Sequence, residues 1–436
     1  MKLIRKNTNK LLLPDYIIKC LSEIDWVNVH KGPEGENIID FYDNDLLMIT
    51  YGTRGSTPFS GPECLRYGGN TTSYQIYSPK LPNNYLYIGD GGSGILEIDK
   101  AIIRKCFSQG INPFADSKEK VSNVISEVVN TYTHYHYDHL HTGAPLTGLF
   151  HSLVIRKMII GGWGPRRMFQ NVFKRPVFPR DFSEMNASYA FYQIKDPRSS
   201  VIIFLPDGDF KEMGCSEFKN LLKQNVPQIK HKKVSHDLAN CVVVKCFPTC
   251  HPDPCISYRY ETYNHDNQIV SAITFMTDHD IRDTDYRETY FRDQVAGSDA
   301  LYIDGQYENK NYIPGFGHGR VELIGEMAQK LKVPNVAIGH HDPTREDSQI
   351  DAMVELAKEA NKSPESDFRS NILGASDRML IFVPAKERGR KGIVIGKMDL
   401  KIGRKVEANL TSELEGTYAY TDLTSGYSVH DHTSTT

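Results

Sequence analysis

The chain has 436 residues, with 51 Lys and Arg against 54 Asp and Glu and a formal net charge of −3. This near balance argues against a surface that binds nucleic-acid backbone over a wide area, because such binding requires clustered basic charge. No apolar stretch reaches the roughly 18 residues of a membrane span, and the basic start of the chain is not followed by a secretory apolar region. The eight Cys are therefore expected to be reduced thiols in the cytoplasm.

Short apolar runs alternate with polar loops along most of the chain. Residues 1–45 are predicted to be an N-terminal extension with an amphipathic segment at 16–26. Strands are expected at Leu46–Tyr51, Leu86–Ile88, Val124–Val129, Val242–Phe247, Ile273–Met276, Ala300–Ile303 and Val336–Ile338, and helices at Arg320–Leu331 and Glu346–Lys362. This alternation predicts one α/β domain over residues 46–400, with sheets covered by helices, followed by a C-terminal tail at 401–436.

Histidines gather in the loop after the third predicted strand, in Thr133-His134-Tyr135-His136-Tyr137-Asp138-His139. His134 and His136 can converge on one cation, and Asp138 and His139 can reach a second. So many imidazoles and a carboxylate are costly to desolvate together unless a metal ion binds them. The alternative is a surface loop that is rich in His and Tyr by chance.

The pattern His-x-His-x-Asp-His after a strand resembles the signature of the metallo-β-lactamase superfamily. Later strand ends match its remaining ligands in the same order: Cys250-His251-Pro252, Thr277-Asp278 and Gly339-His340. The resemblance implies two metal ions, the first held by His134, His136, His251 and Asp278 and the second by Asp138, His139, Asp278 and His340. It also implies that Asp90 orients a ligand without binding metal. Zn²⁺ is the expected metal and Mn²⁺ the alternative, since both accept nitrogen and oxygen donors.

Several other motifs resemble one branch of that superfamily, the phosphodiesterases related to transfer-RNA 3′-processing ribonucleases and cyclic-nucleotide phosphodiesterases. These motifs are Gly52–Pro58, Arg66–Thr71, Tyr258-Arg259, Leu301–Tyr307, Gly317–Gly319 and His340–Pro343. The resemblance covers roughly residues 46 to 395. It implies an αββα sandwich, with two mixed sheets face to face and helices outside, and a homodimer.

The resemblance implies hydrolysis of phosphodiesters, in the first place those of cyclic nucleotides, by a hydroxide that bridges the two ions. Asp138 and His318 are the predicted catalytic residues, with His318 stabilising the phosphoryl oxygen or protonating the leaving group. Arg54 and Asn70 are predicted to contact the substrate, although Arg54 could equally brace its own glycine-rich turn.

Other functions remain open at this stage. A processing nuclease would need an arm for RNA, and the insertion at Lys195–Asn240, with Lys219, Lys223, Lys230, Lys232 and Lys233, is the candidate. A hydrolase of thioesters, lactones or sulfate esters would use the same metal motif. A scaffold protein that has lost catalysis is a further alternative, but such a protein would not keep the full set of metal ligands.

Two further segments have alternative interpretations. The loop Gly161–Arg167 is expected to lie over the site, where Trp163 either stacks on a base or anchors the loop. Cys241, Cys246, Cys250 and Cys255 are expected to be free thiols rather than a structural zinc site, because they lack the close Cys-x₂-Cys spacing.

Overall fold

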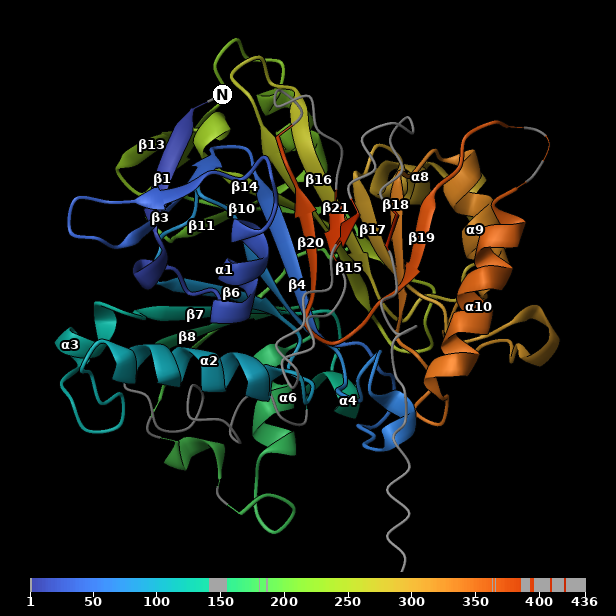
Figure 1. The fold of residues 1–436 in the computed structure, drawn as a ribbon, viewed down its shortest axis with the longest axis horizontal. Helices are drawn as coiled ribbons and strands as arrows, with labels where there is room; N and C mark the ends of the chain where they lie inside the picture. Colours follow the sequence, from blue (N-terminus) through green and yellow to red (C-terminus); the bar gives the residue numbers. More distant parts are fainter. Residues whose placement is uncertain are drawn as a thin grey trace, which may run out of the picture.

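The computed structural model describes residues 2–140, 155–179, 181–185, 187–362, 364, 366–385, 393–395, 408–409 and 419–420. In this part of the chain, two mixed eight-stranded sheets lie face to face, with helices on their outer sides (Figure 1). A cluster of buried side chains, among them Met48, Tyr74, Ile202 and Phe275, fills the space between the sheets. The predicted αββα sandwich is confirmed.

The first sheet has the strand order β21-β20-β4-β5-β6-β7-β8-β9. Its strands are β4 (Leu46–Gly52), β5 (Ser73–Tyr77), β6 (Tyr85–Gly89), β7 (Glu127–Tyr132), β8 (Arg156–Gly161), β9 (Ser188–Gln193), β20 (Met379–Val383) and β21 (Ile393–Ile395). From β6 to β9 the neighbouring strands are parallel, and the remaining pairs are antiparallel.

The second sheet has the order β11-β10-β14-β15-β16-β17-β18-β19. Its strands are β10 (Ser200–Phe204), β11 (Phe210–Gly214), β14 (Val242–Pro248), β15 (Ile256–Tyr263), β16 (Ile269–Met276), β17 (Ala300–Asp304), β18 (Asn335–Gly339) and β19 (Asn371–Gly374). From β16 to β19 the strands are parallel. Parallel strands thus occur in both sheets, and loops after their carboxyl ends are the usual place for a binding site in α/β folds.

Helices cover the outer face of each sheet (Figure 1). The helices of the described residues are α1 (Asp15–Ser22), α2 (Ile95–Ser108), α3 (Lys118–Ser122), α4 (Tyr137–Leu140), α6 (Pro165–Val172), α7 (Cys215–Leu221), α8 (Thr289–Val295), α9 (Val321–Lys330) and α10 (Asp347–Ala360). One apolar cluster joins α2 to the first sheet, and another joins α9 and α10 to the second. None of the described helices combines the length and the apolar character needed to cross a bilayer.

The described residues of the predicted N-terminal extension pack on the domain. β1 (Leu3–Asn7), β3 (Asn37–Tyr42) and β2 (Val29–Lys31) form a small antiparallel sheet in the order β1-β3-β2. Leu11, Ile17, Leu21 and Phe41 are buried in the same apolar cluster as Ile49 of β4.

Two other predictions differ from the structure in detail. β7 begins at Glu127 rather than at Val124, because Val121, Val124 and Ile125 are buried in and after α3 against the first sheet. The insertion at 195–240 contains β10 and β11 as ordinary strands of the second sheet, then α7 and the hairpin β12 (Gln228–His231) and β13 (Val234–Asp237). Of the predicted tail, only the short pair β22 (Ala408–Asn409) and β23 (Ala419–Tyr420) lies within the described residues.

Candidate metal centre

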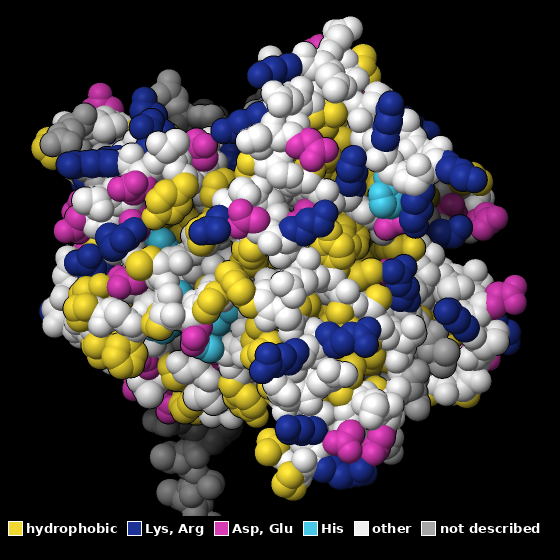
Figure 2. Space-filling model, turned by 180° about the vertical axis from the view of Figure 1, so that it is seen from behind, with side chains coloured by type: hydrophobic (Ala, Val, Ile, Leu, Met, Phe, Trp, Pro, Cys, Tyr) yellow, Lys and Arg dark blue, Asp and Glu magenta, His cyan; other side chains and the backbone are white. Residues whose placement is uncertain are grey.

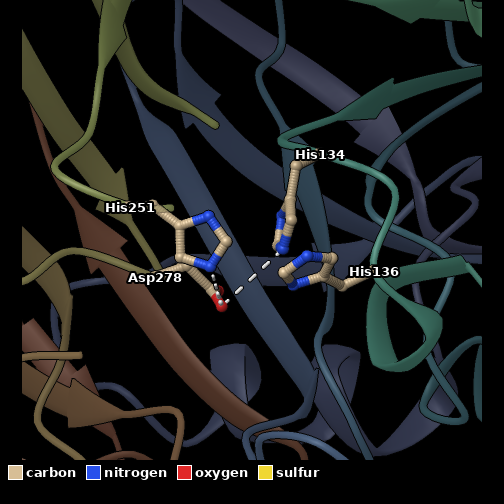
Figure 3. Close-up of side chains that lie close together, drawn as sticks. All are labelled: His134, His136, His251 and Asp278. Carbon is tan, nitrogen blue, oxygen red and sulfur yellow. Dashed lines mark ion pairs between the residues drawn. The ribbon is translucent and has the colours of Figure 1, made fainter. Parts of the chain in front are cut away.

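Four side chains from three separate strand ends form the first ligand group. His134 and His136 follow β7, His251 follows β14 and Asp278 follows β16. Each offers one donor atom, and these atoms lie within 4.8 Å of one another. Figure 3 shows the three imidazole rings gathered around the Asp278 carboxylate.

Asp138, His139 and His340 form the second ligand group, again with donor atoms within 4.8 Å of one another. The Asp278 carboxylate lies between the two groups. Its Oδ2 is 3.1 Å from His139 Nε2, and its Oδ1 is 3.3 Å from His340 Nε2. On the other side, Oδ1 is 3.8 Å from His134 Nε2 and 3.9 Å from His251 Nε2. The Asp278 carboxylate therefore lies within 3.9 Å of imidazole nitrogens from both groups.

Four of the imidazoles use Nδ1 for a contact with the scaffold and direct Nε2 towards Asp278. The Nδ1 partners are Thr133 Oγ1 for His134 (3.2 Å), Asp90 Oδ2 for His139 (2.9 Å), the Asp253 carbonyl for His251 (2.9 Å) and Thr277 Oγ1 for His340 (3.2 Å). His136 is the reverse, since its Nε2 lies 2.8 Å from Asp253 Oδ2 and its Nδ1 remains for an ion. Such outer partners fix the ring orientation and the tautomer of metal-binding histidines.

The donor atoms at the centre of the site are arranged for coordination of a cation rather than for hydrogen bonds with one another. His134 Nε2 is buried and has no hydrogen-bond partner among the described residues. Burial, and then the neighbouring His139, lower the pKa of His134 well below its usual value, so that its ring is neutral and offers a lone pair. Leaving a buried polar atom unpaired is unfavourable, whereas a divalent cation would use the lone pair of His134 Nε2.

The charges around His139 also favour binding of a cation. Burial lowers its pKa, but the carboxylates of Asp138, Asp278 and Asp90 outweigh burial and raise the pKa well above the usual value. Burial alone would raise the pKa of Asp278, and the rings of His340 and His139 hold it well below its usual range. Without metal, a proton on His139 therefore balances the carboxylates, and a cation would replace that proton.

Backbone strain is concentrated at the same strand ends. Asp90, Asp278 and His340 have φ angles of 53°, 51° and 54°. Positive φ is uncommon for residues other than glycine, and strained residues cluster at functional sites. The three residues follow β6, β16 and β18, so the strain turns side chains at the ends of parallel strands into one centre.

His318 lies beside the second ligand group. Its ring is stacked on that of His340, with centroids 5.0 Å apart, and its Nδ1 is 2.8 Å from Asp304 Oδ2. Burial lowers the pKa of His318, but Asp304 outweighs burial and raises it to about 9. The partnership of Asp304 with His318 is not predicted by the sequence motifs, although Asp304 stands at the end of β17 as the ligands stand at or after the ends of other strands.

Arg54 is placed as a brace and not as a substrate contact. Its side chain is fully buried, and it donates from Nε to the Gly68 carbonyl at 2.9 Å and from Nη1 to the carbonyls of Asp342 and Arg345 at 2.9 and 2.7 Å. These bonds tie the turn before β5 to the loop that follows His340. Of the two roles weighed for Arg54, the structure favours the brace.

Asn70 is also engaged within the protein. Its Nδ2 donates to Asp377 Oδ2 at 2.9 Å, and its Oδ1 accepts from Ser93 Oγ at 3.0 Å. These two bonds use one of its two N–H hydrogens and one of the two lone pairs of its amide oxygen, so they hold the side chain in place and leave the other hydrogen and lone pair for a further contact. The four Cys near His251, at 241, 246, 250 and 255, are free thiols.

Comparisons with known proteins found similarity to solved structures at low sequence identity. No protein-family profile and no curated protein sequence matches it. The metallo-β-lactamase fold protein YhfI from Bacillus subtilis is 15% identical, with 78% of this chain and 100% of that chain covered and a TM-score of 0.44. Yeast PDE1 is 13% identical, with coverages of 76% and 98% and a TM-score of 0.44. The long form RNase Z from yeast is 12% identical, with a TM-score of 0.41, and the match covers 84% of this chain and 44% of that enzyme.

Proposed function

We propose that this protein is a dinuclear metal-dependent phosphodiesterase that hydrolyses cyclic nucleotides. The observation that carries the proposal is the Asp278 carboxylate, which lies between two separate groups of His and Asp donors. His134, His136 and His251 would hold one ion, Asp138, His139 and His340 the other, and Asp278 both. Two such ions supply charge neutralisation at phosphorus and a strong nucleophile at neutral pH.

The charge of the donor set favours an anionic substrate. Asp138 and Asp278 are the two carboxylates of the ligand groups, and they contribute two negative charges against the four positive charges of two dications. The Asp138 carboxylate is held in place by the Ser56 N–H, which donates to its Oδ2 at 2.8 Å. A site with residual positive charge attracts a phosphodiester more strongly than a neutral ester or lactone.

His318 is the proposed proton donor to the leaving oxygen. Asp304 accepts a hydrogen bond from His318 Nδ1 and so leaves Nε2 as the nitrogen available to the substrate. The pair resembles other carboxylate–imidazole pairs, in which the carboxylate fixes the tautomer and stabilises the protonated ring. The adjoining Gly317 packs directly on His251, where a Cβ would lie 2.2 Å from the ring, so the loop can approach the ligands closely.

The insertion at 195–240 contributes β10 and β11 to the second sheet, and its five candidate lysines lie in or after α7 and in the hairpin of β12 and β13. RNA binding by these lysines is the alternative that the panel of substrates tests. On the face shown in Figure 2, Lys and Arg side chains are spread over the surface, with Asp and Glu side chains among them.

The test is turnover by purified protein loaded with Zn²⁺ or Mn²⁺. The panel comprises 2′,3′- and 3′,5′-cyclic purine and pyrimidine nucleotides, a thioester, a lactone and a structured precursor RNA, with the Asp278→Asn variant as the control for contaminating activity. We expect ring opening of cyclic nucleotides that the variant lacks. Turnover of the thioester, lactone or RNA without turnover of any cyclic nucleotide would contradict the proposal.

A further inference from the structure

Trp163 has an unusual backbone conformation. Among the described residues, nine residues other than glycine have positive φ: Ser56, Asp90, Trp163, Lys232, Asn267, Asp278, Lys332, His340 and Arg378. Lys232 and Asn267 lie in hairpin turns and Lys332 lies just beyond α9, where positive φ is common. Trp163, with φ of 52°, is a bulky residue for which this conformation is a genuine outlier.

The position of Trp163 matches that of the strained residues in the metal centre. Asp90, Asp278 and His340 each follow the carboxyl end of a strand with parallel neighbours, and Trp163 likewise follows β8, between that strand and α6. The strain at the first three directs side chains into the centre. We expect the strain at Trp163 likewise to position a functional side chain, because a loop without such a function would not require a tryptophan at positive φ.

The loop that carries Trp163 is bonded to the loop that carries the ligands. β8 is the parallel neighbour of β7, with Gly161 opposite Tyr132. Tyr135, which stands between His134 and His136, donates its hydroxyl hydrogen to the Gly162 carbonyl at 2.7 Å. Trp163 is the next residue along the chain, so its loop lies beside the loop that carries His134 and His136.

The indole is available to a ligand. The residue is 41% exposed, which is high for a tryptophan, and its indole has no ring contact or hydrogen bond with another described residue that would account for the strain. The other tryptophan of the chain, Trp26, is packed instead, with its ring 5.2 Å from that of Phe382. Histidine side chains are visible at the surface beside hydrophobic side chains in Figure 2.

We propose that Trp163 is a specificity-determining residue that stacks on the aromatic base of the substrate while its phosphodiester lies at the metal centre. The proposal rests on the proposed function and narrows it to phosphodiesters that carry a nucleobase. Stacking on an aromatic side chain suits a nucleotide because every base has a π-face. A sugar phosphate without a base would lose this contact.

Tryptophan fluorescence tests the proposal without turnover. In the Trp26→Phe protein, Trp163 is the sole tryptophan, so its emission reports directly on the loop. We expect adenosine 5′-monophosphate, the product analogue, to quench this emission saturably, and ribose 5-phosphate at the same concentrations to leave it unchanged. Absence of quenching by adenosine 5′-monophosphate, or equal quenching by ribose 5-phosphate, would overturn the proposal.

Variants test the same contact through kinetics. Trp163→Ala should raise KM for cyclic nucleotides about tenfold and leave kcat nearly unchanged, the size expected for one base–aromatic stack. Phe107→Ala, which removes a 52% exposed aromatic residue on α2, is the matched control and should change neither constant. An unchanged KM in Trp163→Ala would show that the indole only anchors its loop.

Glycine and alanine variants at two positions separate the effect of Trp163 on ligand binding from its effect on stability. Trp163→Gly should unfold at a higher temperature than Trp163→Ala, because glycine adopts φ of 52° without strain, yet both variants should lose quenching and show the raised KM. Lys332, with φ of 53°, is the matched position: Lys332→Gly should likewise be more stable than Lys332→Ala, with normal KM in both. If wild-type protein turns over no cyclic nucleotide, the proposed function fails, and the fluorescence titration still decides the role of Trp163.

Discussion

Asp90 Oδ2 lies 2.9 Å from His139 Nδ1, and neither side chain is reached by solvent. The other carboxylate oxygen of Asp90 accepts the Thr133 N–H at 2.8 Å, directly before His134. One carboxylate therefore fixes both the start of the histidine motif and the orientation of a proposed ligand of the second ion. The Asp90 carboxylate is buried away from the proposed substrate and acts through His139.

Replacing this carboxylate should weaken metal binding without unfolding the protein. Asp90→Asn keeps the size of the side chain but removes the charge that orients His139, and loss of such a partner costs about 10–100-fold in metal affinity. Competition with a fluorescent zinc chelator measures this, with the exposed Asp266→Asn as the control. Equal zinc affinity in Asp90→Asn and in the wild type would show that Asp90 does not orient a metal ligand.

His318 should affect catalysis and not metal content. We expect His318→Ala to retain its metal ions and to lose about 10²–10⁴-fold in kcat on cyclic nucleotides, the usual contribution of a general acid. The loss should be much smaller on a p-nitrophenyl phosphodiester, whose leaving group departs without a proton. Asp304→Asn should show the same pattern in weaker form. An equal loss on both substrates would exclude His318 as the proton donor.

Arg54 should matter for stability and not for substrate binding. Arg54→Lys removes the fork that joins three backbone carbonyls, and a lysine can replace only part of it. We expect the free energy of unfolding to fall by about 2–4 kcal/mol, since buried carbonyls lose charged donors. Thermal unfolding and KM are the measurements, and a raised KM with unchanged stability would restore the substrate-binding role.

Lys157 should give the protein a pH-dependent stability. Burial lowers the pKa of Lys157 to about 7, against the opposing effect of the Asp99 carboxylate. Between pH 7 and about 10.5 the unfolded chain therefore binds more protons than the folded one, so the free energy of unfolding rises with pH over this window, by up to about 1.4 kcal/mol per unit.

Lys157→Met removes this proton and should flatten the profile of unfolding free energy between pH 8 and 10. Lys100→Met, at a lysine of α2 whose side chain is 59% exposed, is the control and should leave the profile as in wild type. Parallel profiles for wild type and Lys157→Met would show that Lys157 titrates normally in the folded protein.

The candidate ligands were predictable because their signal is local. His134 to His139 stand in one loop, and His251, Asp278 and His340 each follow a short apolar run that the structure shows to be a strand. Strand ends in α/β folds meet at a common edge, so order along the chain is sufficient to expect convergence.

The partners of these residues could not be predicted in the same way. Asp253 beside His136, Thr277 beside His340 and Asp304 beside His318 depend on loop conformations and on which ring nitrogen faces inward. Residues 11–41 pack on both β4, which follows them directly, and β20, which lies over 300 residues further on, so no local pattern predicts this packing.

The central claim is that two ions share Asp278, and a crystal structure of the zinc-loaded protein with data at the zinc edge tests it most directly. The account predicts two anomalous peaks about 3.5–4 Å apart on either side of the Asp278 carboxylate, and neither peak at full occupancy in Asp278→Ala. A single peak, or peaks remote from Asp278, would contradict it.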